Sequence, residues 1–212
     1  MLKVNEIFYS IQGESSYWGF PCVFIRLTGC NLRCKYCDTK YAYKRGTRMT
    51  VNKIIDSVNK YDCPLILITG GEPLLQEETP LLAQNLIDQR FKVLIETNGT
   101  QNINLIKSSA VRIVDIKTPG SSESDKTDWM NIKWLDERDQ VKFVLTSKSD
   151  YDWSKQVILN YGLIDRVSVL FSPVLGILNP PDLARWILED RLHVRLQLPL
   201  HKILWPDETS GK

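Results

Sequence analysis

Three of the five cysteines lie within eight residues of the chain, and this spacing is typical of a metal or redox site. Cys30, Cys34 and Cys37 form a C-x3-C-x2-C pattern. Thiolates this close together, in a chain with few other cysteines, suggest metal or redox chemistry rather than disulfide crosslinks. Three thiolates on a short loop can hold three corners of a cubic iron–sulfur cluster, which leaves one iron open to another ligand.

The spacing by itself leaves two other interpretations open. Structural zinc normally takes four ligands, and the two histidines, His193 and His201, lie far away in the sequence. Cys22 or Cys63 could supply the fourth thiol, which would make the chain a zinc-stabilised binding module. The third interpretation is a set of inert, buried thiols.

The composition is that of an ordinary soluble globular protein. The 212 residues are 43% hydrophobic and 25% charged, and a chain of this length can bury a sizeable core without disulfides. A net charge of +2 is too small to indicate nucleic acid or an anionic membrane. The apolar runs are far shorter than the roughly 20 residues of a membrane span, and we see no signal peptide. We therefore expect a single domain, residues 1–212, in the reducing cytoplasm.

Short β-branched runs alternate with segments of helical periodicity. The predicted strands are Cys22–Leu27, Leu65–Thr69, Lys92–Glu96, Val111–Ile116, Val141–Leu145, Val167–Phe171 and Val194–Leu198. Thr50 is the predicted N-cap of a first helix that runs through Ile54, Ile55 and Val58. Further helices are predicted at Glu77–Gln89, Ser149–Tyr161 and Pro180–Glu189. Strands that alternate with helices indicate a parallel sheet. An eight-unit barrel takes about 250 residues, so we predict an α/β fold with an incomplete (βα)6-type parallel barrel.

Polar motifs follow four of the predicted strands directly. They are Thr69–Pro73, Glu96–Gly99, Asp115–Gly120 and Ser172–Pro173. Binding sites in such sheets gather at the carboxyl ends of the strands. The sequence therefore predicts that these motifs belong to one site.

These residues resemble the radical S-adenosylmethionine enzymes, through C-x3-C-x2-C after a first strand and Gly-Gly-Glu-Pro, residues 70–73, after a second. Within that superfamily the chain is similar to the 7-carboxy-7-deazaguanine synthases. That match comes from Gln12-Gly13-Glu14, Arg26, Cys37-Asp38-Thr39 and a late segment, Leu196–Lys202. It covers nearly the whole chain, Glu6–Lys202. One departure is Ser15-Ser16, where family members often continue with a glycine.

The resemblance implies a radical S-adenosylmethionine fold and a [4Fe-4S] cluster on Cys30, Cys34 and Cys37, with S-adenosylmethionine on the fourth iron. An electron from the cluster would cleave a carbon–sulfur bond of S-adenosylmethionine, giving methionine and a 5′-deoxyadenosyl radical. The residues implied to bind S-adenosylmethionine are Tyr36, Cys37, Asp38, Gly71, Glu72, Asp115, Ile116, Lys117, Ser172, Pro173 and Val174. Taken without the resemblance, Gly-Gly-Glu-Pro is an ordinary strand-ending turn.

The implied substrate is 6-carboxy-5,6,7,8-tetrahydropterin. Its implied contacts are Ile11, Gln12, Gly13, Arg26, Thr69, His201 and Pro206. Arg26 would bind the substrate carboxylate through its guanidinium fork, and Thr39 would offer a hydroxyl to Mg²⁺, which prefers oxygen ligands. The alternative for Arg26 is a surface charge at a strand end, and for Thr39 a turn cap.

The implied reaction is a lyase step of queuosine and deazapurine biosynthesis that contracts the pterin ring, releases ammonia and yields 7-carboxy-7-deazaguanine. The implied partners are an electron donor such as a flavodoxin or ferredoxin and a second copy of the chain in a homodimer, without nucleic acid or membrane. An activase of a glycyl-radical enzyme shares the cysteine pattern and is the alternative. Gln12-Gly13-Glu14 and Arg26 speak against it, because they suit a small anionic substrate. Cys22 and Cys63 receive no role.

Overall fold

The computed structural model describes residues 1–107, 109–208 and 210–211, and within them nine strands form one sheet in the order β3-β1-β2-β4-β5-β6-β7-β8-β9. The strands are β1 (Leu2–Ile11), β2 (Pro21–Leu27), β3 (Thr47–Met49), β4 (Leu65–Gly70), β5 (Lys92–Thr97), β6 (Val111–Ile116), β7 (Gln140–Leu145), β8 (Ser168–Pro173) and β9 (Arg195–Leu196). β1 runs antiparallel to β2 and β3, and each neighbouring pair from β2 to β9 is parallel. The predicted parallel sheet is therefore confirmed.

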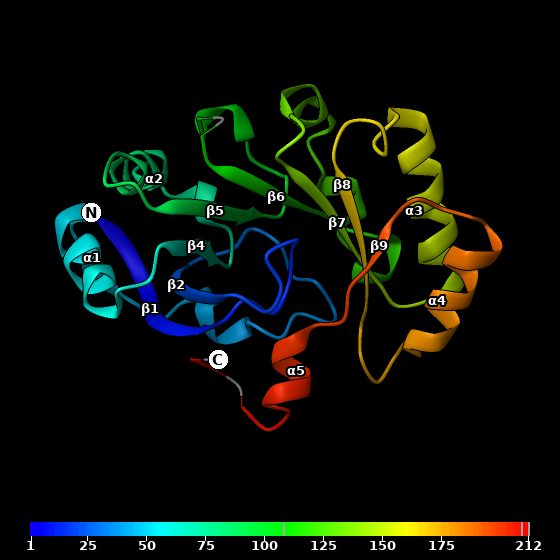
Figure 1. Cartoon of the computed structure of the whole chain (residues 1–212), viewed down its shortest axis with the longest axis horizontal. Helices are drawn as coiled ribbons and strands as arrows, with labels where there is room; N and C mark the ends of the chain where they lie inside the picture. Colours follow the sequence, from blue (N-terminus) through cyan, green and yellow to red (C-terminus); the bar gives the residue numbers. More distant parts are fainter. Residues whose placement is uncertain (108, 209, 212) are drawn as a thin grey trace.

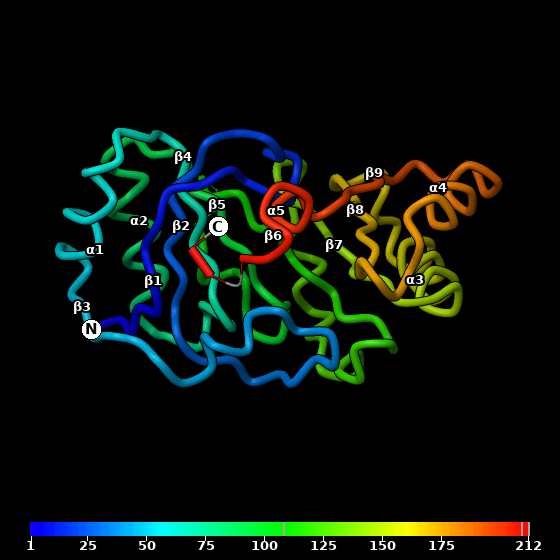
Figure 2. Tube along the Cα trace, turned by 90° about the horizontal axis from the view of Figure 1, so that it is seen from below, coloured from blue at the N-terminus to red at the C-terminus, as the bar shows by residue number. Residues whose placement is uncertain are grey.

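Helices α1 to α4 cover the outer side of the curved sheet, whereas α5 lies on its inner side with the C-terminal end of the chain (Figures 1 and 2). The helices are α1 (Val51–Val58), α2 (Thr79–Asp88), α3 (Lys148–Tyr161), α4 (Pro180–Glu189) and α5 (Leu200–Leu204). Shorter 3-10 helices are η1 (Lys40–Tyr43), η2 (Asn59–Tyr61), η3 (Pro73–Leu75), η4 (Ile103–Leu105), η5 (Pro119–Ser121), η6 (Ser124–Lys126) and η7 (Trp129–Trp134). Within the described residues, no helix is long and apolar enough to cross a membrane.

The six longer parallel strands, β2 and β4 to β8, make the incomplete barrel that the alternation predicted. Thr50 caps α1 as expected, because its side chain accepts a hydrogen bond from the Lys53 backbone N–H at 3.3 Å. The prediction was wrong about the last strand, since β9 spans only Arg195–Leu196 instead of Val194–Leu198. It also missed β1, whose alternation is interrupted by an irregular register between Val4 and Glu6.

The central strands are buried on both faces, which is why they read as continuous apolar runs. Ile66 and Ile68 of β4 are fully buried, as are Val93, Leu94 and Ile95 of β5. Rigid central strands end at defined positions, so they can hold the polar motifs that follow them in fixed places.

Candidate active site

A cavity of about 590 Å³ lies where the parallel strands end, with walls from the loop after β1, the cysteine loop after β2 and the ends of β4 to β8. The segment around α5 completes it through Pro199, His201, Lys202 and Pro206. All of the predicted site residues line this cavity except Glu72 and Ile116. The expectation that the motifs at the strand ends meet in one site is therefore confirmed.

The cysteine loop faces this cavity from the carboxyl end of β2, and Cys30, Cys34 and Cys37 all line it. The Cys37 backbone N–H donates to the Cys34 carbonyl at 3.2 Å, which closes a tight turn. Gly71 packs against this loop so closely that a Cβ there would lie 2.6 Å from Cys30 Cβ. Only glycine fits that approach, so Gly71 fixes the loop against the end of β4.

The other two cysteines lie elsewhere. Cys22 stands at the amino end of β2, and Cys63, whose Sγ lies 3.4 Å from the Pro21 carbonyl, is beside it. Burial and the neighbouring Cys63 raise the pKa of Cys22 well above its usual range. Thiolates that share one tetrahedral zinc ion lie about 4 Å apart, as Zn–S bonds of about 2.3 Å require. Cys22 and Cys63 lie at the opposite end of β2, so they cannot complete such a site with the loop.

The chemistry of the three loop thiols fits an iron–sulfur cluster. Burial raises the pKa of Cys34 to about 11 and that of Cys30 as well, so both thiols keep their protons without a metal and would release them when one binds. Among the described residues, no three His, Cys, Asp or Glu side chains are gathered closely enough to hold a single metal ion. A cluster spreads its ligands farther apart than one ion does.

Glu72 was predicted to contact the cofactor, but its carboxylate lies behind the cavity wall. It is fully buried and accepts hydrogen bonds from the Leu74 N–H at 2.9 Å, the Thr97 hydroxyl at 2.8 Å and the Asn98 N–H at 2.6 Å. Burial raises its pKa to about 7, against the lowering effect of these donors. Glu72 thus ties the motif after β4 to the motif after β5.

Ile116 is the second residue that the structure places outside the cavity. Alternation along β6 points Asp115 and Lys117 into the cavity and buries Ile116 on the opposite face. Asp115 Oδ2 lies 2.9 Å from Lys117 Nζ and 3.2 Å from Lys142 Nζ. Burial disfavours the charge of Asp115, but the two lysines outweigh it and lower its pKa.

Arg26 faces the cavity on the same side of β2 as Phe24, as the alternation predicted. Its Nε donates to Glu6 Oε1 at 2.7 Å, and the Tyr41 hydroxyl donates to the same oxygen at 2.8 Å. The guanidinium also lies over the ring of Phe8, 5.7 Å from its centroid. One edge of the guanidinium is thereby fixed. Its terminal nitrogens have no hydrogen-bond partner among the residues that the structure describes, so they can bind an anion.

Asp38 and Thr39 connect the cysteine loop to α5. The Thr39 hydroxyl donates to Asp38 Oδ1 at 2.8 Å, while Asp38 Oδ2 lies 3.2 Å from Lys202 Nζ and 3.8 Å from His201 Nε2. The neighbouring His201, the charge of Lys202 and the Thr39 hydroxyl together hold the pKa of Asp38 well below its usual range. These contacts hold α5 over the cavity.

The loop after β1 is a second part of the chain that contacts α5. The Leu200 N–H donates to the Gly13 carbonyl at 3.0 Å, and a Cβ on Gly13 would lie 2.8 Å from His201 Nδ1. Gln12 is buried beside it, and its Nε2 has no hydrogen-bond partner in the described chain. An unpaired buried donor is costly, so this atom at the cavity wall indicates a missing ligand.

The structure shows how Ser15 can stand where the family pattern often has glycine. Its φ is +70°, a region that glycine adopts more readily than serine. The Ser15 hydroxyl accepts a hydrogen bond from the Tyr17 N–H at 3.2 Å, and the Ser15 N–H donates to Gln197 Oε1 at 3.0 Å. These two bonds hold the left-handed turn in place of glycine.

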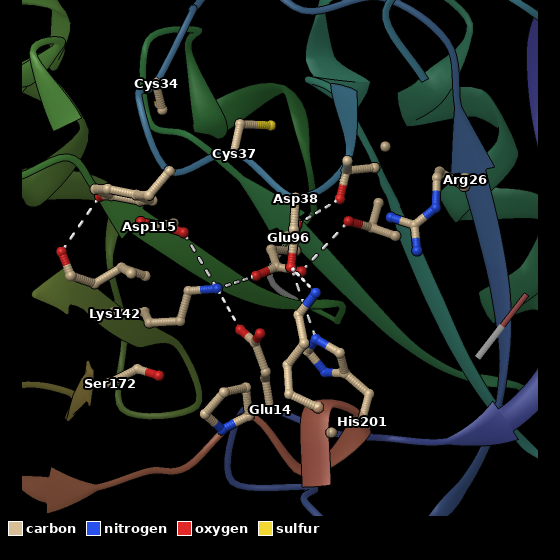
Figure 3. A pocket seen from close by; sticks show the side chains of 18 of the residues that line it. Glu14, Arg26, Cys34, Cys37, Asp38, Glu96, Asp115, Lys142, Ser172 and His201 are labelled. Carbon is tan, nitrogen blue, oxygen red and sulfur yellow. Dashed lines mark hydrogen bonds and ion pairs between the residues drawn. The ribbon is translucent and has the colours of Figure 1, made fainter. Parts of the chain in front are cut away.

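Lys142, Glu14 and Glu96 are cavity residues that the sequence prediction missed (Figure 3). Lys142 lies within the apolar run of β7, and a charged residue in the middle of a buried strand was the signal that could have identified it. Glu14 and Glu96 belong to the motifs Gln12-Gly13-Glu14 and Glu96–Gly99, but neither of them was assigned a role from the sequence. The three side chains meet inside the cavity.

Comparison with known proteins agrees with this geometry. A family model described as the Radical SAM superfamily matches residues 24–141. The 7-carboxy-7-deazaguanine synthase of Chlorobaculum tepidum is 44% identical, over 99% of this chain and 97% of its own length. The chain belongs to the 7-carboxy-7-deazaguanine synthase family. A second member, from Koribacter versatilis, is 42% identical over 99% of this chain and 100% of its own.

A solved structure shares the fold of this chain. The crystal structure of QueE from Escherichia coli aligns with 93% of each chain at a TM-score of 0.76, with 21% sequence identity. As a radical S-adenosylmethionine enzyme, this synthase family member uses a [4Fe-4S] cluster and S-adenosylmethionine. The activase and zinc-module alternatives are thus not supported.

Proposed function

We propose that this enzyme converts 6-carboxy-5,6,7,8-tetrahydropterin to 7-carboxy-7-deazaguanine with loss of ammonia, a step of deazapurine and queuosine biosynthesis. One observation carries the proposal: Arg26, a half-buried cation fixed by Glu6, lines the same cavity as the three loop cysteines. A substrate carboxylate bound there would lie in one cavity with the cofactors. The family membership points to the same reaction.

The cofactors would be held at the cysteine end of the cavity. Cys30, Cys34 and Cys37 would bind the cluster, and the group of residues around it would bind S-adenosylmethionine: Tyr36, Asp38, Gly71, Asp115, Lys117, Ser172, Pro173 and Val174. When bound, these cofactors supply one-electron, hydrogen-abstracting chemistry. The protein's part is to orient the pterin towards them and to exclude water.

The substrate would occupy the other half of the cavity. Arg26 would bind its carboxylate through the terminal guanidinium nitrogens. The unpaired Gln12 Nε2 would donate to an acceptor on the heterocycle, and Ile11, Gly13 and Thr69 would line the same wall. His201 and Pro206 would cover the substrate from the segment around α5, which keeps water away from the reacting atoms.

Thr39 would help to hold a Mg²⁺ ion in this cavity. Thr39 lines the cavity two residues after Cys37, and its hydroxyl is an oxygen ligand of the kind that Mg²⁺ prefers. Few protein ligands are needed, because Mg²⁺ keeps several waters and accepts substrate oxygens.

We further propose that residues 1–212 act as one domain, that two copies associate, and that a protein such as a flavodoxin or ferredoxin delivers the electron. The dimer proposal has a direct test. Light scattering on the purified protein should give twice the chain mass of 24.5 kDa, and a mass of one chain would contradict it.

An anaerobic turnover assay tests the reaction. Protein with reconstituted cluster, S-adenosylmethionine, Mg²⁺ and a reductant should consume the tetrahydropterin and form 7-carboxy-7-deazaguanine, which mass spectrometry identifies. A protein that cleaves S-adenosylmethionine but leaves the pterin unchanged would contradict the proposed substrate.

A further inference from the structure

Lys142 brings three carboxylates from three different parts of the chain to one point in the cavity. It donates to Glu14 Oε2 at 2.5 Å, forms an ion pair with Glu96 Oε1, and lies 3.2 Å from Asp115 Oδ2. Figure 3 shows the ammonium group at the centre of these oxygens. Glu14 follows β1, Glu96 belongs to β5 and Asp115 to β6, so Lys142 on β7 connects four segments.

The charges in this cluster do not cancel. Two cations, Lys142 and Lys117, face three carboxylates, and Lys117 contacts only Asp115 among them. Tyr36 and Cys34 are the other titratable groups close to Lys117. Burial disfavours the ammonium, but the carboxylates outweigh it and raise the pKa of Lys142 well above its usual value. Lys142 is therefore a permanent cation, and Glu14 and Glu96 depend on it for compensation.

Each glutamate gives Lys142 one oxygen and keeps a second. Glu96 Oε2 accepts from the Thr69 hydroxyl at a long 3.3 Å. Glu14 Oε1 makes no hydrogen bond within the described part of the chain, and both side chains line the cavity together with Gln12. A fixed carboxylate with a free oxygen is a strong acceptor for N–H groups of a ligand.

We infer that Lys142 is a positioning residue for substrate binding: its ion pairs orient Glu14 and Glu96 as acceptors for the N–H donors of the heterocycle. The inference takes the identity of the heterocycle from the proposed function, whereas the electrostatic role of Lys142 stands on the cluster itself. Burying a cation among three carboxylates carries a large desolvation cost, and such clusters gather at functional sites.

Lys142→Met, Lys142→Arg and the control Lys155→Met test this inference in the reconstituted enzyme. Lys155 also pairs with one carboxylate, Asp190 at 2.7 Å, but it lies outside the cavity. Lys142→Met should raise the KM for the tetrahydropterin by about 10- to 100-fold, because charge-assisted hydrogen bonds to the substrate are lost. Lys142→Arg should recover part of this loss. The loss of S-adenosylmethionine cleavage without substrate should be much smaller than the loss of pterin turnover.

The pH dependence separates positioning from a merely structural role. Lys142→Met removes the positive charge that faces the three carboxylates, which favours proton binding by the cluster, and a protonated carboxyl is a poorer acceptor. An opposite charge at this range shifts such titrations by about 1–3 units. The kcat/KM of Lys142→Met should therefore fall more steeply than that of wild type as pH decreases from 8.5 to 6.5. The profile of Lys155→Met should match wild type.

Two outcomes would overturn the inference. One is an unchanged KM and pH profile in Lys142→Met, with only a lower melting temperature. The other is an equal loss of S-adenosylmethionine cleavage in the absence of the pterin, which would assign Lys142 to the cofactor. If Lys142→Met does not fold, Lys142→Met/Glu96→Gln removes one of the uncompensated charges, and this variant should regain stability but keep the high KM.

A readout without turnover separates this inference from the proposed function. Carbon-13 NMR of labelled carboxyl groups should show proton uptake at higher pH in Lys142→Met than in wild type. If wild type does not bind the tetrahydropterin in a calorimetric titration, the proposed function fails. The NMR titration still decides whether Lys142 controls the charge of the cluster, and identical titrations in the two proteins would refute that role.

Discussion

Arg26 Nε donates to Glu6 Oε1 at 2.7 Å, and this bond aims a half-buried guanidinium at the cavity. Glu6 lies on β1 and Arg26 on β2, directly opposite each other in the antiparallel register. Because the Tyr41 hydroxyl binds the same Glu6 oxygen, three segments of the chain define the direction of the cation. This relationship leads to the first prediction.

Arg26→Ala should lower kcat/KM for the tetrahydropterin by about 10- to 100-fold or more, because a charge-assisted hydrogen bond is worth about 1.5–3 kcal/mol. Glu6→Gln should show a smaller effect in the same direction, since it loosens the guanidinium without removing it. Steady-state kinetics measures both. Binding of S-adenosylmethionine should barely change. A variant that loses substrate-independent S-adenosylmethionine cleavage would place Arg26 in the cofactor site instead.

Only the three loop cysteines should be needed for the cluster. Cys30→Ala, Cys34→Ala or Cys37→Ala should each lose the intact cluster, because each removes one of its three protein ligands. Cys22→Ala and Cys63→Ala should retain it, because these thiols lie at the opposite end of β2. Iron and sulfide content after anaerobic reconstitution measures this. Loss of iron from Cys22→Ala or Cys63→Ala would refute the assignment.

Turnover should depend on Mg²⁺ through Thr39. Mg²⁺ binds sparse sites weakly, so chelator-treated enzyme should keep its cluster, turn over slowly and recover when Mg²⁺ is added. Misplacing reacting groups by about 1 Å can cost on the order of 100-fold in rate. Thr39→Ala should blunt the recovery, whereas Thr39→Ser should preserve it.

A Mg²⁺ titration compares wild type with the Thr39 variants directly. The rate should be measured as a function of Mg²⁺ concentration for wild type and both Thr39 variants. The same metal dependence in wild type and Thr39→Ala would leave Thr39 as a turn residue bonded to Asp38.

Glu72 should make stability depend on pH in an unusual direction. Burial raises its pKa in the folded state from the ordinary 4.5 to about 7. Between these values the folded protein keeps a proton that the unfolded chain has released, so stability falls as pH rises through this range. The free energy of unfolding should fall by roughly 3 kcal/mol at most over this range. The decrease should level off above pH 7.

Urea unfolding of wild type and Glu72→Gln at several pH values measures the contribution of Glu72, as the difference between the two free energies of unfolding. Glutamine cannot titrate, so the difference between the two proteins should change between pH 4.5 and 7. Glutamine also presents an N–H group to donors that need an acceptor, so the variant should be less stable throughout. A difference that is constant over this range would contradict the shifted titration of Glu72.

Much of the fold and of the site was predictable from local sequence features. Buried parallel strands produce apolar runs such as Leu65–Thr69, helices carry caps such as Thr50, and three clustered cysteines mark a cofactor loop. The carboxyl ends of parallel strands share one edge of the sheet, so the motifs after them had to meet. These features depend on neighbours in the sequence, and the sequence determined them.

The tertiary structure decided which side of each segment faces the cavity and which charges meet there. Glu72 and Ile116 belong to motifs that line the site, yet both turn away from it. Two backbone N–H groups and the Thr97 hydroxyl surround Glu72, and strand alternation places Ile116 on the opposite face of the sheet. Lys142 meets Glu14, 128 residues away in the sequence. Contacts of that separation leave no local pattern, because only the closing of the curved sheet brings their segments together.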